Sequence, residues 1–223
     1  MTTIVGILGL SHDEECREKY GMHLDFLREL IIEFNPDIIC GEVIPSTWDL
    51  ICKNKAGEGY WANPDQNYKS YWAEPASEYW KLIFPLCKER GIRFEPVDWL
   101  EMDVWWDFDP FAPFSEAEQE RLKLELSNWT EKQLAVCGNS PIPFNSFELD
   151  DLTRGQFEWM GQVNPIAQAF RWTHRHLIMI QRIKNVIKKN PDSTILCIAG
   201  YGHNYCYYNE LKGEPVHLIY PLR

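Results

Sequence analysis

The sequence predicts an α/β fold, namely a three-layer sandwich with a mostly parallel central sheet and helical insertions over its carboxyl edge. Short apolar runs occupy residues 3–8, 37–43 and 194–199, and an Asn-Pro-Asp turn introduces each of the last two. Such runs are typical of buried strands. The segments between them repeat apolar residues at spacings of three and four, as amphipathic helices require. Buried strands that alternate with helices indicate a parallel sheet covered on both faces.

Each remaining element has a local signal of its own. Ser115 and Glu118 stand three apart and form a capping-box signature, and lysines 188 and 189 suit the end of the longest helix. In chain order, and with these two helices included, the elements expected besides the three apolar strands are a helix from 13 to 34, a helix over 76–90, a strand over 92–97, a helix from 115 to the mid-130s, a helix over 165–189, a short helix over 204–212 and a strand over 216–220.

A chain of 223 residues suits one α/β domain over 1–223 and is long enough to bury a core. Two stretches, at about 44–75 and 100–165, interrupt the framework, and we expect them to form a lid. The aromatic side chains of the first stretch either line a pocket or pack it onto the core. In the second, the acidic residues at 148, 150 and 151 are expected to face solvent.

Composition restricts the partners and the location. The formal net charge is −11. Nucleic acids and anionic membranes are bound by clustered lysine and arginine, so this charge argues against both as partners. No apolar run approaches the ~20 residues that span a bilayer, and the first residues lack a basic signal segment. The seven cysteines include no C-x-x-C pair, which is typical of reduced core residues. We expect a cytoplasmic protein with a small-molecule or peptide substrate, and the oligomeric state stays open.

Chemically reactive side chains follow the predicted strands. The first and last long apolar runs each end in G-x-x-H, which places His12 and His203 at strand ends, and Glu42 follows Gly41. Asp98 follows the strand over 92–97. Because the carboxyl ends of parallel strands meet at one edge, these side chains are expected to gather there.

The helix over 165–189 adds an arginine. Arg171, Arg175 and Met179 are spaced four residues apart and therefore lie on one side of the helix. Arg175 is thereby placed to reach the carboxyl edge of the sheet. His174 and His176 are two apart and point in different directions, which disfavours joint coordination.

Together these motifs resemble the TraB/Tiki and erythromycin esterase superfamily. The resemblance rests on the paired G-x-x-H motifs, the Gly-Glu and the Arg-x-x-x-Met, and it covers 3–43, 91–98 and 173–203. Its members include metal-dependent proteases, macrolide esterases, pheromone-shutdown proteins and haem-binding lipoproteins. The family pattern has Asp or Asn directly after the arginine, whereas this chain has His176, which weakens any carry-over to position 176 but not to Arg175.

The leading hypothesis is hydrolysis of an ester or peptide bond. His12, Glu42 and His203 form a plausible ligand set for Zn, Mn or Fe, whose bound water would attack the carbonyl. Arg175 would stabilise the oxyanion, and Asp98 is expected to orient a metal-bound histidine or, less readily, to bind metal or cap the next segment.

Three alternatives stay open at this stage. In a metal-independent esterase, Glu42 or one histidine is the general base, as the resemblance to erythromycin esterase implies. A protein without turnover would use the histidines to bind haem or metal, or would bind a peptide. In the plainest case both histidines only form hydrogen bonds within the fold at the strand ends and take no part in function. A closed pocket over the histidines would favour a substrate.

Overall fold

The computed structural model describes residues 2–54, 75–99 and 109–222. Within these ranges a single sheet has the strand order β3-β2-β4-β1-β5, and every neighbouring pair is parallel. Residues 4–10 of β1 pair in register with residues 194–200 of β4, so the two central strands end level with each other. The strands are β1 (Ile4–Leu10), β2 (Ile38–Gly41), β3 (Arg93–Pro96), β4 (Thr194–Gly200) and β5 (His217–Ile219).

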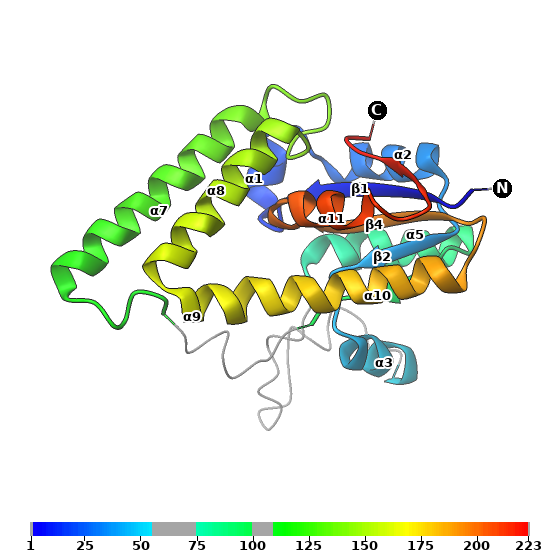
Figure 1. Ribbon diagram of the computed structural model, residues 1–223. Coiled ribbons are helices and arrows are strands. Elements are labelled where there is room, and N and C mark those ends of the chain that lie inside the picture. The colour runs from blue at the N-terminus through cyan, green and yellow to red at the C-terminus, as the bar shows by residue number, and fades with distance from the viewer. Residues whose placement is uncertain (1, 55–74, 100–108, 223) are drawn as a thin grey trace.

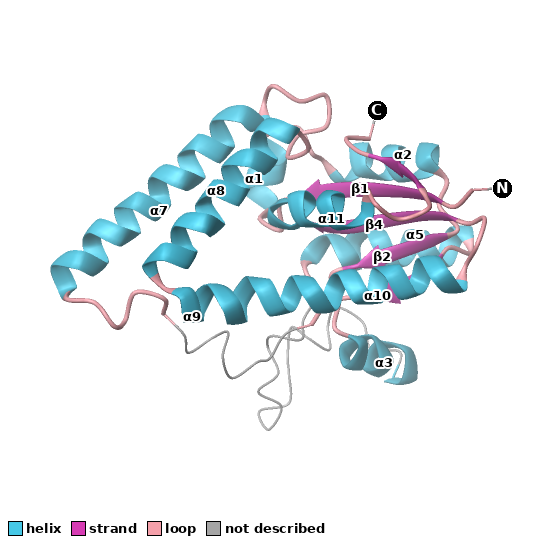
Figure 2. Cartoon of the chain, viewed as in Figure 1, coloured by secondary structure: helices cyan, strands magenta, loops and turns pink. Residues whose placement is uncertain are grey.

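Helices cover both faces of the sheet, which makes three layers (Figures 1 and 2). Buried Leu8 and Leu196 belong to the core on one face, whereas Val5 and Cys197 belong to the core on the other. This alternation is the period of two that a strand buried on both sides requires. The predicted α/β sandwich is therefore confirmed. The covering elements are α2 (Leu24–Phe34), the π-helical turn η2 (Tyr79–Ile83) and α5 (Phe84–Arg90) on the first face, and α10 (Arg175–Lys189) and α11 (Asn204–Leu211) on the second.

Two long helices, α7 (Glu116–Cys137) and α8 (Phe147–Val163), extend past the carboxyl end of β1 (Figure 1). They lie within the stretch predicted as the second insertion. The capping box of α7 is present, with the backbone N–H of Ser115 donating to Glu118 at 3.3 Å. Of the first stretch, α3 (Pro45–Asn54) is described. The aromatic residues at positions 60–72, which were expected to line a pocket or to pack this stretch onto the core, lie outside the described residues, as do residues 100–108.

The predicted helix over 165–189 consists of consecutive pieces, α9 (Pro165–Gln168), the π-helical turn η3 (Ala169–His174) and α10. Short helices α1 (Glu14–Lys19) and η4 (Tyr201–His203) follow β1 and β4. Every helix in the described ranges falls short of the length or apolarity that a membrane span needs. All seven cysteines carry free thiols.

A buried polar cluster fixes the segment between α7 and α8 on β1. The Asn145 side chain accepts from the Gly9 N–H at 2.7 Å and donates to the Gly9 carbonyl at 2.8 Å. Nearby, the Tyr220 hydroxyl donates to Asp150 at 3.0 Å. Asp150 is buried, so the expectation that it faces solvent was wrong, because Tyr220 from the end of the chain packs against α8.

Candidate active site

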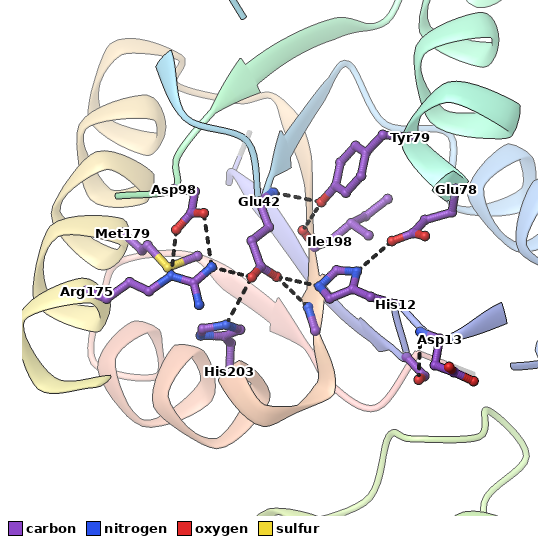
Figure 3. Close-up of polar contacts among 12 residues, drawn as sticks. His12, Asp13, Glu42, Glu78, Tyr79, Asp98, Arg175, Met179, Ile198 and His203 are labelled. Carbon is purple, nitrogen blue, oxygen red and sulfur yellow. Dashed lines mark hydrogen bonds and ion pairs between the residues drawn. The ribbon is translucent and has the colours of Figure 1, made fainter. Parts of the chain in front are cut away.

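The carboxyl edge of the sheet brings the five predicted residues together (Figure 3). His12, Glu42 and Asp98 follow β1, β2 and β3, His203 ends η4 directly after β4, and Arg175 begins α10. Their proximity follows from the parallel sheet, because each strand delivers its next residues to the same edge.

The Glu42 carboxylate is the centre of this group. One oxygen, Oε2, accepts from the Gly200 N–H at 2.7 Å and lies 3.0 Å from His12 Nε2. The other, Oε1, contacts the Arg175 guanidinium and lies 3.4 Å from His203 Nε2. The Glu42 side chain is 9% exposed, so these contacts replace most of its hydration.

Gly200 permits this close approach. A β-carbon at Gly200 would lie 3.1 Å from His12 Nε2 and 3.5 Å from Glu42 Oε2. The backbone beside Glu42 is also fixed by Tyr79, whose hydroxyl accepts from the Glu42 N–H at 2.7 Å and donates to the Ile198 carbonyl at 3.2 Å. The carboxylate therefore sits on a rigid part of the sheet edge.

Asp98 pairs with Arg175, and among the described residues it forms no hydrogen bond or ion pair with a histidine. Its two oxygens lie 2.7 Å from Arg175 Nε and 3.0 Å from Arg175 Nη2. Both side chains are 8% exposed. The expected role of Asp98 in orienting a metal-bound histidine has no counterpart in these contacts. Instead, Asp98 holds the guanidinium that contacts Glu42.

His12 lies between two carboxylates. Its Nε2 faces Glu42, and its Nδ1 lies 2.6 Å from Glu78 Oε1. The second oxygen of Glu78 accepts from Arg17 at 3.0 Å, and Glu78 and Arg17 are both buried. From Arg17 to Asp98, positive and negative groups therefore alternate along one continuous chain of contacts.

The electrostatics of His12 and Glu42 follow from this arrangement. Burial by itself would lower the pKa of His12, but the charges and hydrogen bonds of Glu42 and Glu78 outweigh it and raise the pKa from 6.5 to about 10. For Glu42, burial opposes ionisation, yet the neighbouring His203, Arg175 and His12 hold the pKa of the carboxyl well below its usual range. At neutral pH the pair is an imidazolium and a carboxylate.

A second histidine supports His203 from behind. His176 Nε2 lies 2.7 Å from His203 Nδ1, and both rings are buried. Burial, followed by the charges of His203 and Arg175, lowers the pKa of His176 well below 6.5, so His176 is neutral. His174, in contrast, is exposed.

Glu78, Arg17 and His176 were missed as site residues by sequence reasoning. Glu78 follows no strand, and Arg17 lies in an acidic helix start that looks solvated. Their roles become apparent only from the contacts that they make with residues distant in sequence. The departure at His176 from the family pattern was the one available signal, and its contact with His203 is visible only in the fold.

A cavity of about 600 Å³ opens onto this group. Its floor includes His12, Glu42, Arg175 and His203, and α7 and α8 line its opposite side with apolar and neutral polar residues. A volume of this size is typical of sites for small molecules. The stretch predicted as the second insertion thus contributes side chains to the cavity over the sheet edge.

No protein-family model matches the sequence, and searches of curated proteins and of solved structures find no match. The resemblance to the TraB/Tiki and erythromycin esterase superfamily therefore stays a prediction.

The residues at the sheet edge do not fit a divalent cation in this arrangement. In the part of the chain that the structure describes, no three histidine, cysteine or acidic side chains are placed to hold one ion. The Arg175 guanidinium contacts Glu42, and a protonated His12 has no lone pair to offer. A metal held by His12, Glu42 and His203 stays a prediction, and it would require Arg175 to withdraw and His12 to lose its proton.

Proposed function

We propose that the protein is a hydrolase of ester or amide bonds that uses Glu42 as general base and His12 as general acid, without a metal ion. The observation that carries this proposal is the contact of 3.0 Å between the two side chains at the floor of the cavity. Their mutual contact raises the pKa of His12 and lowers that of Glu42, as in an ion pair, so that at neutral pH Glu42 is a carboxylate able to accept a proton and His12 an imidazolium able to give one.

The proposed reaction begins with a water molecule beside Glu42. The carboxylate takes a proton from this water as its oxygen bonds to the substrate carbonyl carbon. The bond to the leaving oxygen or nitrogen then breaks, and the His12 imidazolium gives its proton to the leaving atom. A proton passes from Glu42 to His12 across their direct contact and restores the starting state. The products are a carboxylic acid and an alcohol or amine.

The remaining charged residues position this pair. Glu78 and Arg17 hold His12 Nδ1 in place, as the third member of a catalytic triad does for its histidine. Asp98 fixes Arg175, whose positive charge lies beside Glu42 and favours the negative charge that develops on the substrate.

A cavity over both histidines favours a substrate over the alternatives without turnover. The cavity is lined by the described residues of α7, α8 and η3 as well as by the sheet edge. An open, flat edge would suit haem or a protein partner better, and those binding functions stay predictions.

The test is a hydrolysis screen on protein treated with EDTA, with residual metal measured by elemental mass spectrometry. Chromogenic esters, lactones and short peptides are the substrates. We expect turnover that EDTA leaves intact, and a loss of about 10²- to 10⁴-fold in Glu42→Gln and His12→Gln, the usual range for acid–base groups.

Matched controls use exposed residues outside the cavity. Glu18 and His23 form an exposed pair on the surface, so Glu18→Gln and His23→Gln make the same chemical changes there. These controls are expected to keep wild-type rates. Full activity in Glu42→Gln would overturn the proposal. Activity that EDTA removes and Zn²⁺, Mn²⁺ or Fe²⁺ restores would instead establish the predicted metal site.

A further inference from the structure

The wall of the cavity that α7 and α8 form differs chemically from its floor. The described residues of α7 and α8 that line the cavity carry no charged side chain, whereas the floor contains Glu42, His12 and Arg175. The wall combines apolar side chains with those of threonine and glutamine. Such neutral groups take no part in the acid–base steps proposed above. In a cavity they suit the part of a substrate that does not react.

Gln133 is the central polar residue of this wall. It lies on α7, and its Nε2 donates to Thr153 Oγ1 at 3.1 Å and to Gln156 Oε1 at 2.8 Å. Thr153 and Gln156 are three residues apart and are therefore neighbours on one side of α8. Because α7 and α8 lie side by side (Figure 1), the three side chains form a bridge between the helices, which we call the amide bridge.

The amide bridge is buried, although a polar side chain between two helices is costly. Gln133 and Thr153 are 2% and 1% exposed. A buried amide must find partners for its hydrogen-bonding groups, whereas an apolar side chain of similar size has no such requirement. Buried polar groups that line a cavity therefore point to a ligand that completes their hydrogen bonds.

The amide bridge also has hydrogen-bonding capacity that its own bonds do not use. Gln133 Nε2 donates twice, but within the described ranges no hydrogen bond involves Gln133 Oε1 or Gln156 Nε2. If both amides rotate by a half-turn, the bond between them is kept and donor and acceptor exchange places. In either arrangement the two glutamines offer one acceptor and one donor, which is the pattern that another amide group satisfies.

The cavity is large enough for a substrate that reaches from the floor to the amide bridge. A sphere of about 600 Å³ is about 10 Å across, and an extended chain of six bonds spans about 7 Å. Leu126, Phe157 and Met160 belong to the same wall and suit a hydrocarbon linker. A charged group at this wall would lose hydration without meeting a counter-charge on α7 or α8.

We propose that the substrate carries a neutral amide group, joined to the reacting bond by an apolar chain or ring, and that Gln133 and Gln156 bind this amide. Peptides and N-acylated amino-acid derivatives belong to this chemical class. The inference rests on the proposed function, because Glu42 and His12 act on the ester or amide bond at the floor. The two glutamines would determine specificity without contacting the reacting atoms.

Binding is tested first, without any reaction. The probe is N-hexylurea, which has a carbonyl and N–H groups but no ester or carboxylic amide bond. Its isostere 2-nonanone has the same arrangement of non-hydrogen atoms around a carbonyl and lacks the N–H groups. Calorimetry on EDTA-treated protein should show that N-hexylurea binds about 3- to 30-fold more tightly, as for one or two neutral hydrogen bonds. Gln133→Leu and Gln156→Leu should each lower this ratio towards one.

Gln162→Leu is the matched control, because Gln162 is exposed on α8 and lies outside the cavity lining. It should leave the ratio at the wild-type level. Circular dichroism checks that each variant is folded, and Gln156→Leu, at a half-buried position, still tests the proposal if Gln133→Leu does not fold. A bridge that only joins the helices would change the stability of these variants and not the ratio. A wild-type ratio of one, or a ratio that both substitutions leave unchanged, would overturn the proposal.

A kinetic comparison separates this inference from the hydrolase proposal. The 4-nitrophenyl ester of 6-acetamidohexanoic acid is compared with 4-nitrophenyl nonanoate, whose chain has the same length without the amide. We expect kcat/KM to favour the amide-containing ester by about 3- to 30-fold, and the ratio to fall towards one in Gln133→Leu. Binding of N-hexylurea that depends on the two glutamines, without cleavage of any ester, would support the amide site and refute the hydrolase. Cleavage of both esters with equal kcat/KM would support the hydrolase and overturn this inference.

Discussion

Replacing Arg175 with methionine tests the charged group at the sheet edge most severely. The change removes the cation shared by Glu42 and Asp98, whose side chains are only 9% and 8% exposed. Removing one partner of a buried ion pair costs about 3 to 5 kcal/mol, because the other charge is left buried and uncompensated. For a chain of this size, that cost corresponds to a fall in Tm of roughly 6 to 20 °C.

Urea unfolding at pH 7, followed by circular dichroism, measures this change in the free energy of unfolding. Arg154→Met is the control, because that arginine is 52% exposed and its ion pairs should contribute no more than about 1 kcal/mol. Adding Asp98→Asn to Arg175→Met should recover part of the loss, since it removes one of the two stranded charges. A loss below about 1 kcal/mol in Arg175→Met would refute the reasoning.

Two further predictions concern the polar cluster beside β1. Burial, opposed by the Tyr220 hydrogen bond, raises the pKa of Asp150 from 3.8 to about 7; stability from this group is therefore complete below pH ~4 and is lost as pH rises towards 7. Urea unfolding measures the free energy of unfolding of Asp150→Asn minus that of wild type. This difference should rise by roughly 3 to 5 kcal/mol from pH 4 to pH 8, because only the wild type loses stability as Asp150 ionises. A difference that is constant with pH would contradict this. Gly9→Ala would place its β-carbon against the buried Asn204 amide and should cost about 1 to 3 kcal/mol by the same assay. Gly138→Ala, where a β-carbon meets nothing within 4 Å, should cost nothing, and equal losses in the two variants would refute the steric argument.

Much of the fold and the centre of the site could be predicted from local sequence patterns. Apolar runs and helical spacing indicate a parallel sheet, and a parallel sheet brings the residues that follow its strands to one edge. That single rule places His12, Glu42, Asp98 and His203 together. Arg175 joins them because a helical stripe points it towards the same edge.

The missed features depend on contacts between segments that are distant in sequence. Glu78 reaches His12 across 66 positions, and Asp150 is buried by Tyr220 from 70 positions away. No local spacing in the sequence predicts such a pair. The protonation of His12 was missed for the same reason, since it depends on two carboxylates from different elements.

Titration of the His12 ring by NMR tests the central claim most directly. Histidine ring signals, assigned with His12→Gln, are followed from pH 5 to 11 in wild type and in Glu78→Gln. We expect His12 to stay protonated until about pH 10 in wild type and to lose its proton at a pH roughly 1 to 3 units lower in Glu78→Gln, because one of its two carboxylate partners becomes neutral. A wild-type midpoint near 6.5 that Glu78→Gln leaves unchanged would contradict the proposed acid–base pair.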